Sequence, residues 1–198
     1  MILGTQCTRN CRFCAVSTHP TPPPPDPSEP GHIADAVSEL GLKYVVITSV
    51  TRDDLPDGGA GHYAATVHAV KGARPSAMVE LLIPDLAMEE EALKVVLSSG
   101  ADVVGHNLET VRRLTPLVRD RRASYERSLA VLEWFAKAGV VTKTSLLLGL
   151  SESVLEVEEA LRDARNVGVR HVAMGQYLRP SSQHHPVARY WTPEEFTH

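Results

Sequence analysis

The chain has 198 residues, of which 43% are hydrophobic and 22% are charged, and its formal net charge is −4. This length accommodates one domain with a sizeable core, and the composition is that of an ordinary globular protein. No excess of basic residues argues for nucleic acid as a partner, and no apolar run approaches the roughly 20 residues that a membrane span needs. We therefore expect neither nucleic acid nor a membrane as a partner.

The first 30 residues contain three unlike segments. Residues 1–5 predict a short strand, and the only three cysteines of the chain follow at positions 7, 11 and 14. Residues 20–30 include seven prolines in eleven positions, which excludes a helix or a central strand and predicts an extended strut. An odd number of clustered cysteines without a secretion signal favours a reducing compartment and metal or redox chemistry over disulfides.

The rest of the chain alternates between helices and short apolar strands. Helical periodicity with a terminal glycine predicts helices at 32–41, 62–72, 89–100, 124–139 and 153–168. Apolar runs predict strands at 43–50, 77–85, 101–107, 140–149 and 170–178. Six strands in strict alternation with helices predict a parallel α/β fold, either an open doubly wound sheet or a partly or wholly closed barrel.

In both architectures, functional residues gather where the strands end. Polar residues follow several of these strands: Asp53, Asp54, Asp57, Asn107 and Lys143. The three aspartates have a plain alternative role in turns and helix caps, and Asn107 has the same alternative. Lys143 lies in an apolar strand, where an isolated ammonium is costly, so we expect it to face a polar cavity. His184 and His185 are expected on the surface and not as ligands.

The cysteines have the spacing Cys-x3-Cys-x2-Cys. Three thiolates at Cys7, Cys11 and Cys14 can hold three irons of a [4Fe–4S] cluster and leave the fourth iron open for chemistry. The alternative is a structural zinc site that adds His19 to the three cysteines.

This spacing, with an aromatic residue just before the last cysteine and a strand before the first, resembles the radical S-adenosylmethionine (SAM) enzymes. The resemblance implies one [4Fe–4S] cluster whose open iron binds SAM, and reductive cleavage of SAM to methionine and a 5′-deoxyadenosyl radical. It also implies a six-stranded parallel partial (β/α)6 barrel, which agrees with the strand count.

Five segments extend the resemblance to lipoyl synthases over nearly the whole chain: "MILGTQCTRNCRFCAV", "LKYVVITSVTRDDLPDGGAGHYA", "HNLETVRRLTPLVRDRRASYERSL", "TKTSLLLGLSES" and "GQYLRPSSQHHPVARYWTPEEF". The family implies sulfur insertion at C6 and C8 of a protein-bound octanoyl chain. It implies an octanoylated lipoyl carrier domain or a glycine-cleavage H protein as the substrate, flavodoxin or ferredoxin as the electron donor, and a cytoplasmic location.

The resemblance also implies contacts to SAM. Thr48 and Ser49 match positions near the SAM amino group, and Asn107 and Glu109 match positions near the ribose and methionine parts. A cation at Lys143 or Arg119 would hold the SAM carboxylate. The full set of implied SAM contacts is Thr48, Ser49, Asn107, Glu109, Arg119, Lys143, Ser145, Gln176, Tyr177 and Leu178.

Two departures from the family pattern qualify this interpretation. Ser151 replaces a usual glycine, which is tolerable unless that position needs a positive φ. The family also carries a second cluster, the sulfur donor, on an N-terminal extension and a C-terminal tail. We therefore expect residues 1–198 to be a single core domain, truncated at both ends. The alternatives are a non-catalytic or radical-generating-only core, and a different radical SAM enzyme that takes its sulfur from elsewhere.

Overall fold

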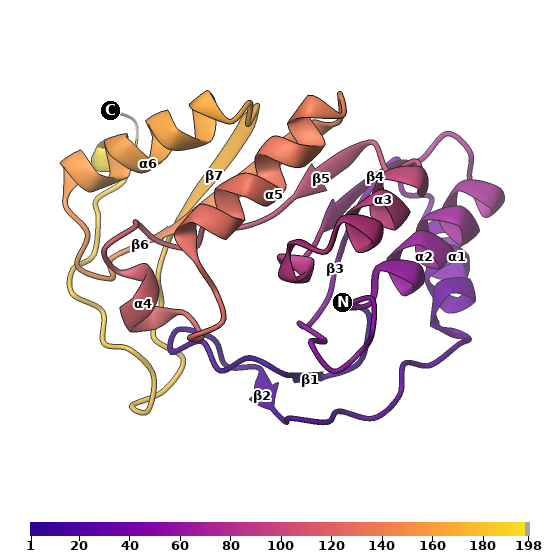
Figure 1. Ribbon diagram of the computed structural model, residues 1–198, viewed down its shortest axis with the longest axis horizontal. Helices are drawn as coiled ribbons and strands as arrows, with labels where there is room; N and C mark the ends of the chain where they lie inside the picture. The colour runs from indigo at the N-terminus through magenta and orange to yellow at the C-terminus, as the bar shows by residue number, and fades with distance from the viewer. Residues whose placement is uncertain (197–198) are drawn as a thin grey trace. The chain divides into compact units, whose positions relative to one another are not determined.

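The computed structural model describes residues 1–196, and Figure 1 shows its helices and strands. Two compact units make up the chain. The first consists of Met1–Thr8 and Val16–Gly105, and the second of Arg9–Ala15 and the chain from His106 onward. Residues 197 and 198 of the predicted domain lie outside the described residues.

The first unit is built on three parallel strands, which are β3 (Tyr44–Thr48), β4 (Met78–Leu82) and β5 (Val103–Gly105). Three helices lie side by side on one side of these strands (Figure 1): α1 (Glu29–Glu39), α2 (Ala60–Ala73) and α3 (Glu90–Ser98). A single short turn of 3-10 helix, η1 (Leu86–Met88), precedes α3.

Strand alternation explains the core of the first unit. Ile47, Val79 and Leu81 are buried, while their neighbours Tyr44 and Val46 on the opposite face are partly exposed. Because successive side chains of a strand point to opposite faces, only one face of the sheet is covered by helices. The core of this unit therefore lies between the strands and the helices.

The second unit contains two parallel strands, β6 (Val141–Leu148) and β7 (His171–Gln176). Its helices are α4 (Thr115–Val118), α5 (Tyr125–Lys137) and α6 (Val154–Asn166), and the short η2 (Glu194–Phe196) lies near the end of the chain. Along β6 buried and half-buried residues alternate strictly. The buried face carries Leu146 and Leu148, which join a core with Leu108, Val118 and Tyr125.

The beginning of the chain differs from the prediction. Residues 1–5 form no strand, only an isolated bridge between Ile2 and Ser49. Leu3 and Gly4 both have a positive φ, and the amide of Leu3 donates to the carboxylate of Glu29 (2.8 Å) and not to a neighbouring strand. Pairing occurs later, between β1 (Gln6–Cys7) and β2 (Ser17–Thr18), which the sequence did not predict.

The strut is shorter than expected because its last two residues belong to a helix. Helix α1 starts at Glu29 and has Pro30 in its first turn, where the missing amide hydrogen costs nothing. Apart from this boundary and the first strand, the predicted helices and the other five strands are present, and the strands in each unit are parallel. In the described part of the chain, no helix combines the length and the apolarity that crossing a membrane requires.

Ser151 occupies a backbone conformation that favours glycine. Its φ is 92°, in the left-handed region, and its carbonyl accepts a hydrogen bond from Arg113 (2.9 Å). A side chain in this region is strained. We predict that Ser151→Gly raises the free energy of unfolding by about 0.5–1 kcal/mol in urea titrations. The control Ser99→Gly, at φ −63°, should lower it. Equal effects of the two variants would contradict this interpretation.

Helix α6 begins with a capping box. Ser153 and Glu156 exchange hydrogen bonds between side chain and backbone, and Arg113 also binds the Glu156 carboxylate. The hydrogen bond from Arg113, followed by that from the Ser153 amide, lowers the pKa of Glu156 from 4.5 to about 2.

Because the folded pKa lies below the unfolded value, this carboxylate stabilises the fold above pH 4.5 and loses that effect as the pH falls toward 2. We predict that Glu156→Gln is less stable than the parent chain at pH 7, and that the difference shrinks between pH 4.5 and pH 3. Urea titrations at pH 7, 4 and 3 measure this. A difference that stays constant with pH would refute the assignment, and Glu39→Gln on exposed α1 is the control.

Candidate functional site

Cys7 lies in the first unit, in the short pairing of β1 with β2. Its carbonyl accepts the amide of His19 (3.0 Å). The next residue, Thr8, is held on two sides: its amide donates to the Thr51 carbonyl (2.9 Å), and its hydroxyl donates to the Asp53 carboxylate (2.9 Å). The backbone around this half-buried thiol is therefore fixed to the loop that follows β3.

Cys11 and Cys14 lie in the second unit, in a tight turn where the amide of Cys14 donates to the carbonyl of Cys11 (3.0 Å). The amide of Asp120 donates to the sulfur of Cys11 (3.3 Å), and the Asp120 carboxylate accepts the amide of Asn10 (2.9 Å). Arg12 also donates its amide to the carbonyl of Val118 (2.7 Å). The last residue of α4 and the residues just after it therefore hold this part of the cysteine loop in place.

The surroundings of Cys11 suit a metal-bound thiolate. Burial raises the pKa of its thiol, while the amide of Asp120 and the charge of Arg119 act in the opposite direction. Amide hydrogen bonds to sulfur are a known means by which proteins tune iron–sulfur clusters. Among residues 1–196 no group of three or more His, Cys, Asp or Glu side chains is already arranged around a metal position. The fit to a cluster therefore depends on the thiol donors, their spacing and this amide–sulfur bond.

Asn107 and Glu109 follow β5 and lie together in the second unit. The Asn107 amide donates to the Glu109 carboxylate (3.2 Å). Glu109 has φ 67°, and its backbone bridges β6, receiving the amide of Leu147 (2.8 Å) and donating to the carbonyl of Ser145 (3.0 Å). The structure thus brings three of the predicted site residues, Asn107, Glu109 and Ser145, into one place.

Burial raises the pKa of Glu109, and the charge of Arg119 and the amide of Asn107 oppose this rise. The half-buried carboxyl of Glu109 therefore lies in the electric field of the Arg119 guanidinium. In the second unit this pair places a carboxyl group after β5 close to a guanidinium at the end of α4.

Arg119 is buried and belongs to a hydrogen-bond network that the sequence analysis missed. Its guanidinium donates to the hydroxyl of Ser128 (2.9 Å) and to the carbonyl of Leu108 (3.3 Å). The hydroxyl of Ser128 lies 2.9 Å from Nε2 of His106, and all three side chains are buried. The Ser128 hydroxyl thus joins Arg119 to His106 in one buried network.

Lys143 and Ser145 both lie on the half-buried face of β6, between the buried residues Thr142, Thr144 and Leu146. Lys143 is therefore not on the face of β6 that joins the apolar core, and its facing a polar cavity stays a prediction. The carbonyl of Lys143 accepts the amide of His106 (3.0 Å), so the backbone links it to the segment that carries Asn107.

The predicted residues at the end of β7 have different surroundings. The side chain of Gln176 is occupied by the chain's own C-terminal segment: its Nε2 donates to the carbonyl of Arg189 (3.3 Å), and its Oε1 accepts the backbone amide of Trp191 (2.9 Å). Tyr177 is buried in the core and donates its hydroxyl to the carbonyl of His185 (2.8 Å). Leu178 is 69% exposed.

The glutamate of the "GLSE" segment has a structural role that the sequence did not indicate. Glu152 accepts the amides of Gly149 (2.5 Å) and Leu150 (2.8 Å), and it also accepts the indole hydrogen of Trp191 (2.9 Å). Gly149 has φ 108°, and a Cβ there would lie 2.6 Å from the carbonyl of Arg189. Glycine at this position lets the C-terminal segment pack against the end of β6.

Thr48 and Ser49 end β3 in the first unit. The carbonyl of Thr48 accepts the amide of Ile2 (2.8 Å). The hydroxyl of Ser49 donates to the carbonyl of Val50 (2.7 Å) and lies 2.8 Å from the hydroxyl of Tyr63. Ser49 is therefore held in place by the buried Tyr63 of α2.

The aspartates after β3 have the structural roles that were their plain alternative. Asp57 accepts the amides of Gly59 (2.9 Å) and Gly61 (2.7 Å) and so caps the start of α2. Asp54 makes a two-point ion pair with the buried Arg52. Asp53 accepts the hydroxyl of Thr8.

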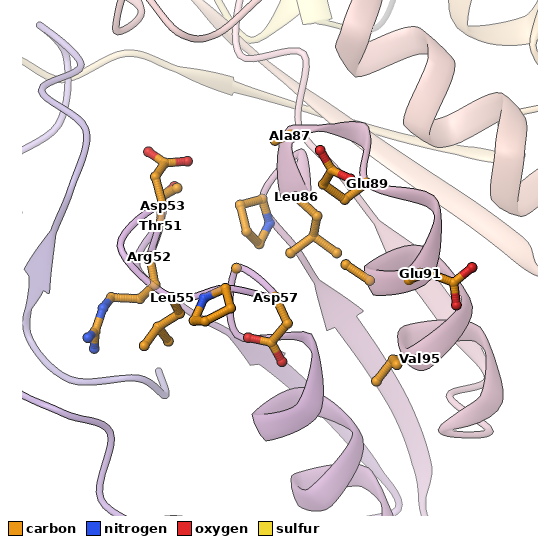
Figure 2. Close-up of a pocket in the computed structure, with 14 residues that line it drawn as sticks. Thr51, Arg52, Asp53, Leu55, Asp57, Leu86, Ala87, Glu89, Glu91 and Val95 are labelled. Atoms are coloured by element: carbon orange, nitrogen blue, oxygen red, sulfur yellow. The ribbon is translucent and has the colours of Figure 1, made fainter.

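A pocket of about 420 Å³ lies in the first unit, between the loop after β3 and the loop after β4 (Figure 2). Four carboxylates line it: Asp53, Asp57, Glu89 and Glu91. Figure 2 shows the guanidinium of Arg52 pointing away from the side that carries the two glutamates. Of the predicted SAM contacts and cluster ligands, none lines this pocket.

A turn with unusual backbone geometry borders the same pocket. The consecutive residues Leu86, Ala87 and Met88 all have φ between 46° and 63°. The buried carboxylate of Asp85 accepts the amide of Ala87 (3.1 Å) and so helps to hold the turn in this conformation.

Comparisons with known proteins identify the class. The family model of the radical SAM superfamily matches residues 1–172. The fold resembles that of the crystal structure of methylornithine synthase (PylB), with a TM-score of 0.76 and 16% identity over 96% of this chain and 55% of that one. It also resembles SuiB of Streptococcus suis bound to S-adenosylmethionine, with a TM-score of 0.71 and 12% identity over 94% of this chain and 42% of that one. The chain therefore has the partial (β/α) barrel fold of the radical SAM superfamily, as predicted.

Curated relatives define the family more narrowly. The chain is 52% identical to lipoyl synthase of Thermus thermophilus over 99% of its own length and 61% of that protein. It is 55% identical to lipoyl synthase of Pyrobaculum calidifontis over 99% of its length and 68% of that protein. The chain belongs to the lipoyl synthase family, and it spans about three fifths to two thirds of the length of these relatives.

The network around Arg119 has a measurable energetic role. We predict that Ser128→Ala lowers the free energy of unfolding by about 1–3 kcal/mol, because it removes a buried partner from both Arg119 and His106. Urea titration of the variant measures this. The control is Ser99→Ala, whose hydroxyl binds only the carbonyl of Val96, which also accepts a backbone amide. If both variants lose the same stability, the network does not stabilise the fold.

Proposed function

We propose that this chain is the radical-generating core of a lipoyl synthase. Cys7, Cys11 and Cys14 would hold one [4Fe–4S] cluster, which when bound would supply the electron that cleaves SAM to methionine and a 5′-deoxyadenosyl radical. The observation that carries the proposal is the Cys-x3-Cys-x2-Cys spacing within a chain of this family.

The chain's own residues would position the cofactors. Backbone hydrogen bonds hold both ends of the cysteine loop, and the amide of Asp120 would stabilise the charge on the sulfur of Cys11. Arg119, held by Ser128 and Leu108, would present a fixed cation to the SAM carboxylate. The Glu109 carboxylate would accept hydrogen bonds, and the Asn107 amide would donate or accept them, near the ribose and methionine parts of SAM.

The remaining proposed SAM contacts depend on their positions in the strands and on the exposure of their side chains. Thr48 and Ser49 lie at the carboxyl end of β3, where ligands of such folds gather. Lys143 and Ser145 lie within β6, on its half-buried face. For Gln176 and Tyr177 the side chains are engaged within the fold, so we propose that they contribute backbone groups and shape. Leu178 is exposed and would offer an apolar surface to adenine.

The substrate would be an octanoyl chain on a lipoyl carrier domain or on a glycine-cleavage H protein, with sulfur inserted at C6 and C8. The sequence contains three cysteines, and one cluster uses all three. The second candidate function is a core that cleaves SAM to 5′-deoxyadenosine without inserting sulfur, because the one cluster that these three cysteines would hold suffices for that step.

We predict that anaerobic reconstitution yields about four irons and four sulfides per chain. With SAM and dithionite the reconstituted chain should form 5′-deoxyadenosine, measured by chromatography. Cys11→Ala should lose at least 90% of both the iron and this product, because three thiolates are needed to hold the cluster. The same reaction is run with an octanoylated carrier protein. Formation of lipoyl product would indicate the complete activity, and its absence would indicate a core that only generates the radical.

The control is His19→Ala. Nδ1 of His19 accepts the amide of Thr21 (3.1 Å), and the radical SAM assignment gives this side chain no role in binding iron. The variant should therefore keep its iron and its 5′-deoxyadenosine yield. The proposal would be wrong if the parent chain bound zinc instead of iron and if both Cys11→Ala and His19→Ala lost that zinc. The structural zinc site would then be the better assignment.

A further inference from the structure

One surface of the second unit is strongly basic although the whole chain is acidic. The chain has 24 acidic and 20 basic residues. Residues 9–15, 117–122 and 179–185 together contain six arginines and a single acidic residue, Asp120. Four of these arginines are exposed and form what we call the basic rim: Arg12, Arg121, Arg122 and Arg179.

Hydrogen bonds hold these three segments together, so the rim is one surface and not a feature of the sequence alone. Arg12 donates its amide to the carbonyl of Val118 (2.7 Å) and accepts the amide of His185 at its own carbonyl (2.8 Å). Arg179 donates to the carbonyl of His184 (2.9 Å). Figure 1 shows segment 9–15 below α4, with the segment that follows β7 beside it.

The segments that carry the basic rim also contact two of the proposed cluster ligands. The ring of His184 hydrogen-bonds the carbonyl of Cys14 (3.1 Å), and the amide of Asp120 binds the sulfur of Cys11 (3.3 Å). These segments therefore lie against the loop that carries both thiols. A partner that binds there is brought close to the cluster.

The single acid in these segments offsets one of the six arginine charges and leaves the segments with a net positive charge. The side chain of Asp120 is 10% exposed, and its carboxylate is engaged by Arg122 and by the amide of Asn10. Burial alone would raise the pKa of Asp120, but these hydrogen bonds prevail and hold it far below its usual range. The carboxylate thus anchors Arg122 and the cysteine loop and is not presented to solvent.

One exposed leucine accompanies these arginines. Leu117 is 52% exposed and lies in the same segment as Arg121. A charged surface with little apolar area is typical of small, transient and salt-sensitive complexes, which include those of electron-transfer proteins. A stable, permanent interface would be larger and more apolar.

We propose that the basic rim is the docking surface for an acidic one-electron carrier protein, which reduces the cluster. The inference depends on the proposed function, because it needs a cluster at Cys11 and Cys14. In the step the carrier loses one electron and the cluster gains one, and no bond is formed or broken. The positive rim attracts the acidic carrier and orients it toward the cysteine loop.

The test compares Arg121→Glu with Arg121→Lys and with Arg170→Glu. Arg121 is exposed and has no role in holding SAM or the cluster. Arg170 is also exposed, but it lies before β7, at the end of the strand opposite Gln176. Reduced flavodoxin is the probe, and the oxidation of its flavin is followed by stopped flow at several ionic strengths.

We predict that Arg121→Glu slows the second-order reduction by about tenfold at low ionic strength, and that the difference narrows as salt is added. Arg121→Lys, which keeps the charge, and Arg170→Glu should stay within about twofold of the parent chain. Binding of oxidised flavodoxin, measured by flavin fluorescence, should weaken in Arg121→Glu alone, whether or not a cluster is present.

The outcomes separate this inference from the proposed function. SAM cleavage with saturating dithionite should be the same for all four chains; if none of them cleaves SAM, the proposed function fails. Equal flavodoxin rates and affinities for Arg121→Glu and Arg170→Glu would overturn the docking surface. It would also be overturned if Arg121→Glu weakens binding of an octanoylated carrier and leaves flavodoxin binding unchanged, because the rim would then serve the substrate protein.

Discussion

Parallel strands can be joined only by a crossover that returns the chain to the same edge of the sheet, and this constraint decides where the polar residues of the protein lie. Within each unit the strands are parallel, so their carboxyl ends lie at one edge, and several polar residues follow them there. Thr48 and Ser49 end β3, and Asn107 and Glu109 follow β5. The buried faces of the strands carry leucine, valine and isoleucine, which leaves the strand ends for chemistry.

The arginines of residues 112–127 show how one residue type is divided among three tasks. Arg112 and Arg113 make ion pairs with Glu126, Asp163 and Glu156, and these pairs join the segment to α5 and α6. Arg119 is buried and fixed by hydrogen bonds. Because its side chain is already ordered, binding of an anionic ligand would cost little side-chain conformational entropy. Arg121 stays exposed and contributes to the field outside the protein.

Two polar residues act through their neighbours and not through a ligand. Glu152 binds two backbone amides and the indole of Trp191, so it links the end of β6 to the C-terminal segment. Ser128 connects Arg119 to His106 and so sets the orientation of a guanidinium beside Glu109. In both cases the residue is needed because a buried polar group without a partner is costly.

The sequence by itself determined the parallel α/β class, five of the six strands, the main helices and the cysteine motif. These features depend on local periodicity, on glycine stops and on spacing along the chain, all of which can be read without knowing what lies nearby in space. It also singled out Ser151 as a position where a positive φ would disfavour serine, and the structure shows that its φ is 92°. The assignment of residues 1–5 as a strand was wrong, because Leu3 donates its amide to the distant Glu29.

Only the tertiary structure decided how the polar residues at the strand ends are used. Gln176 binds Arg189 and Trp191, which lie 13 and 15 positions further along the chain. Ser128, on α5, binds Arg119 and His106, which lie outside that helix. The basic rim likewise needs three segments that lie far apart in the sequence. Partners of this kind are chosen by packing and by the need to satisfy buried hydrogen-bonding groups, and neither leaves a periodic signal in the sequence.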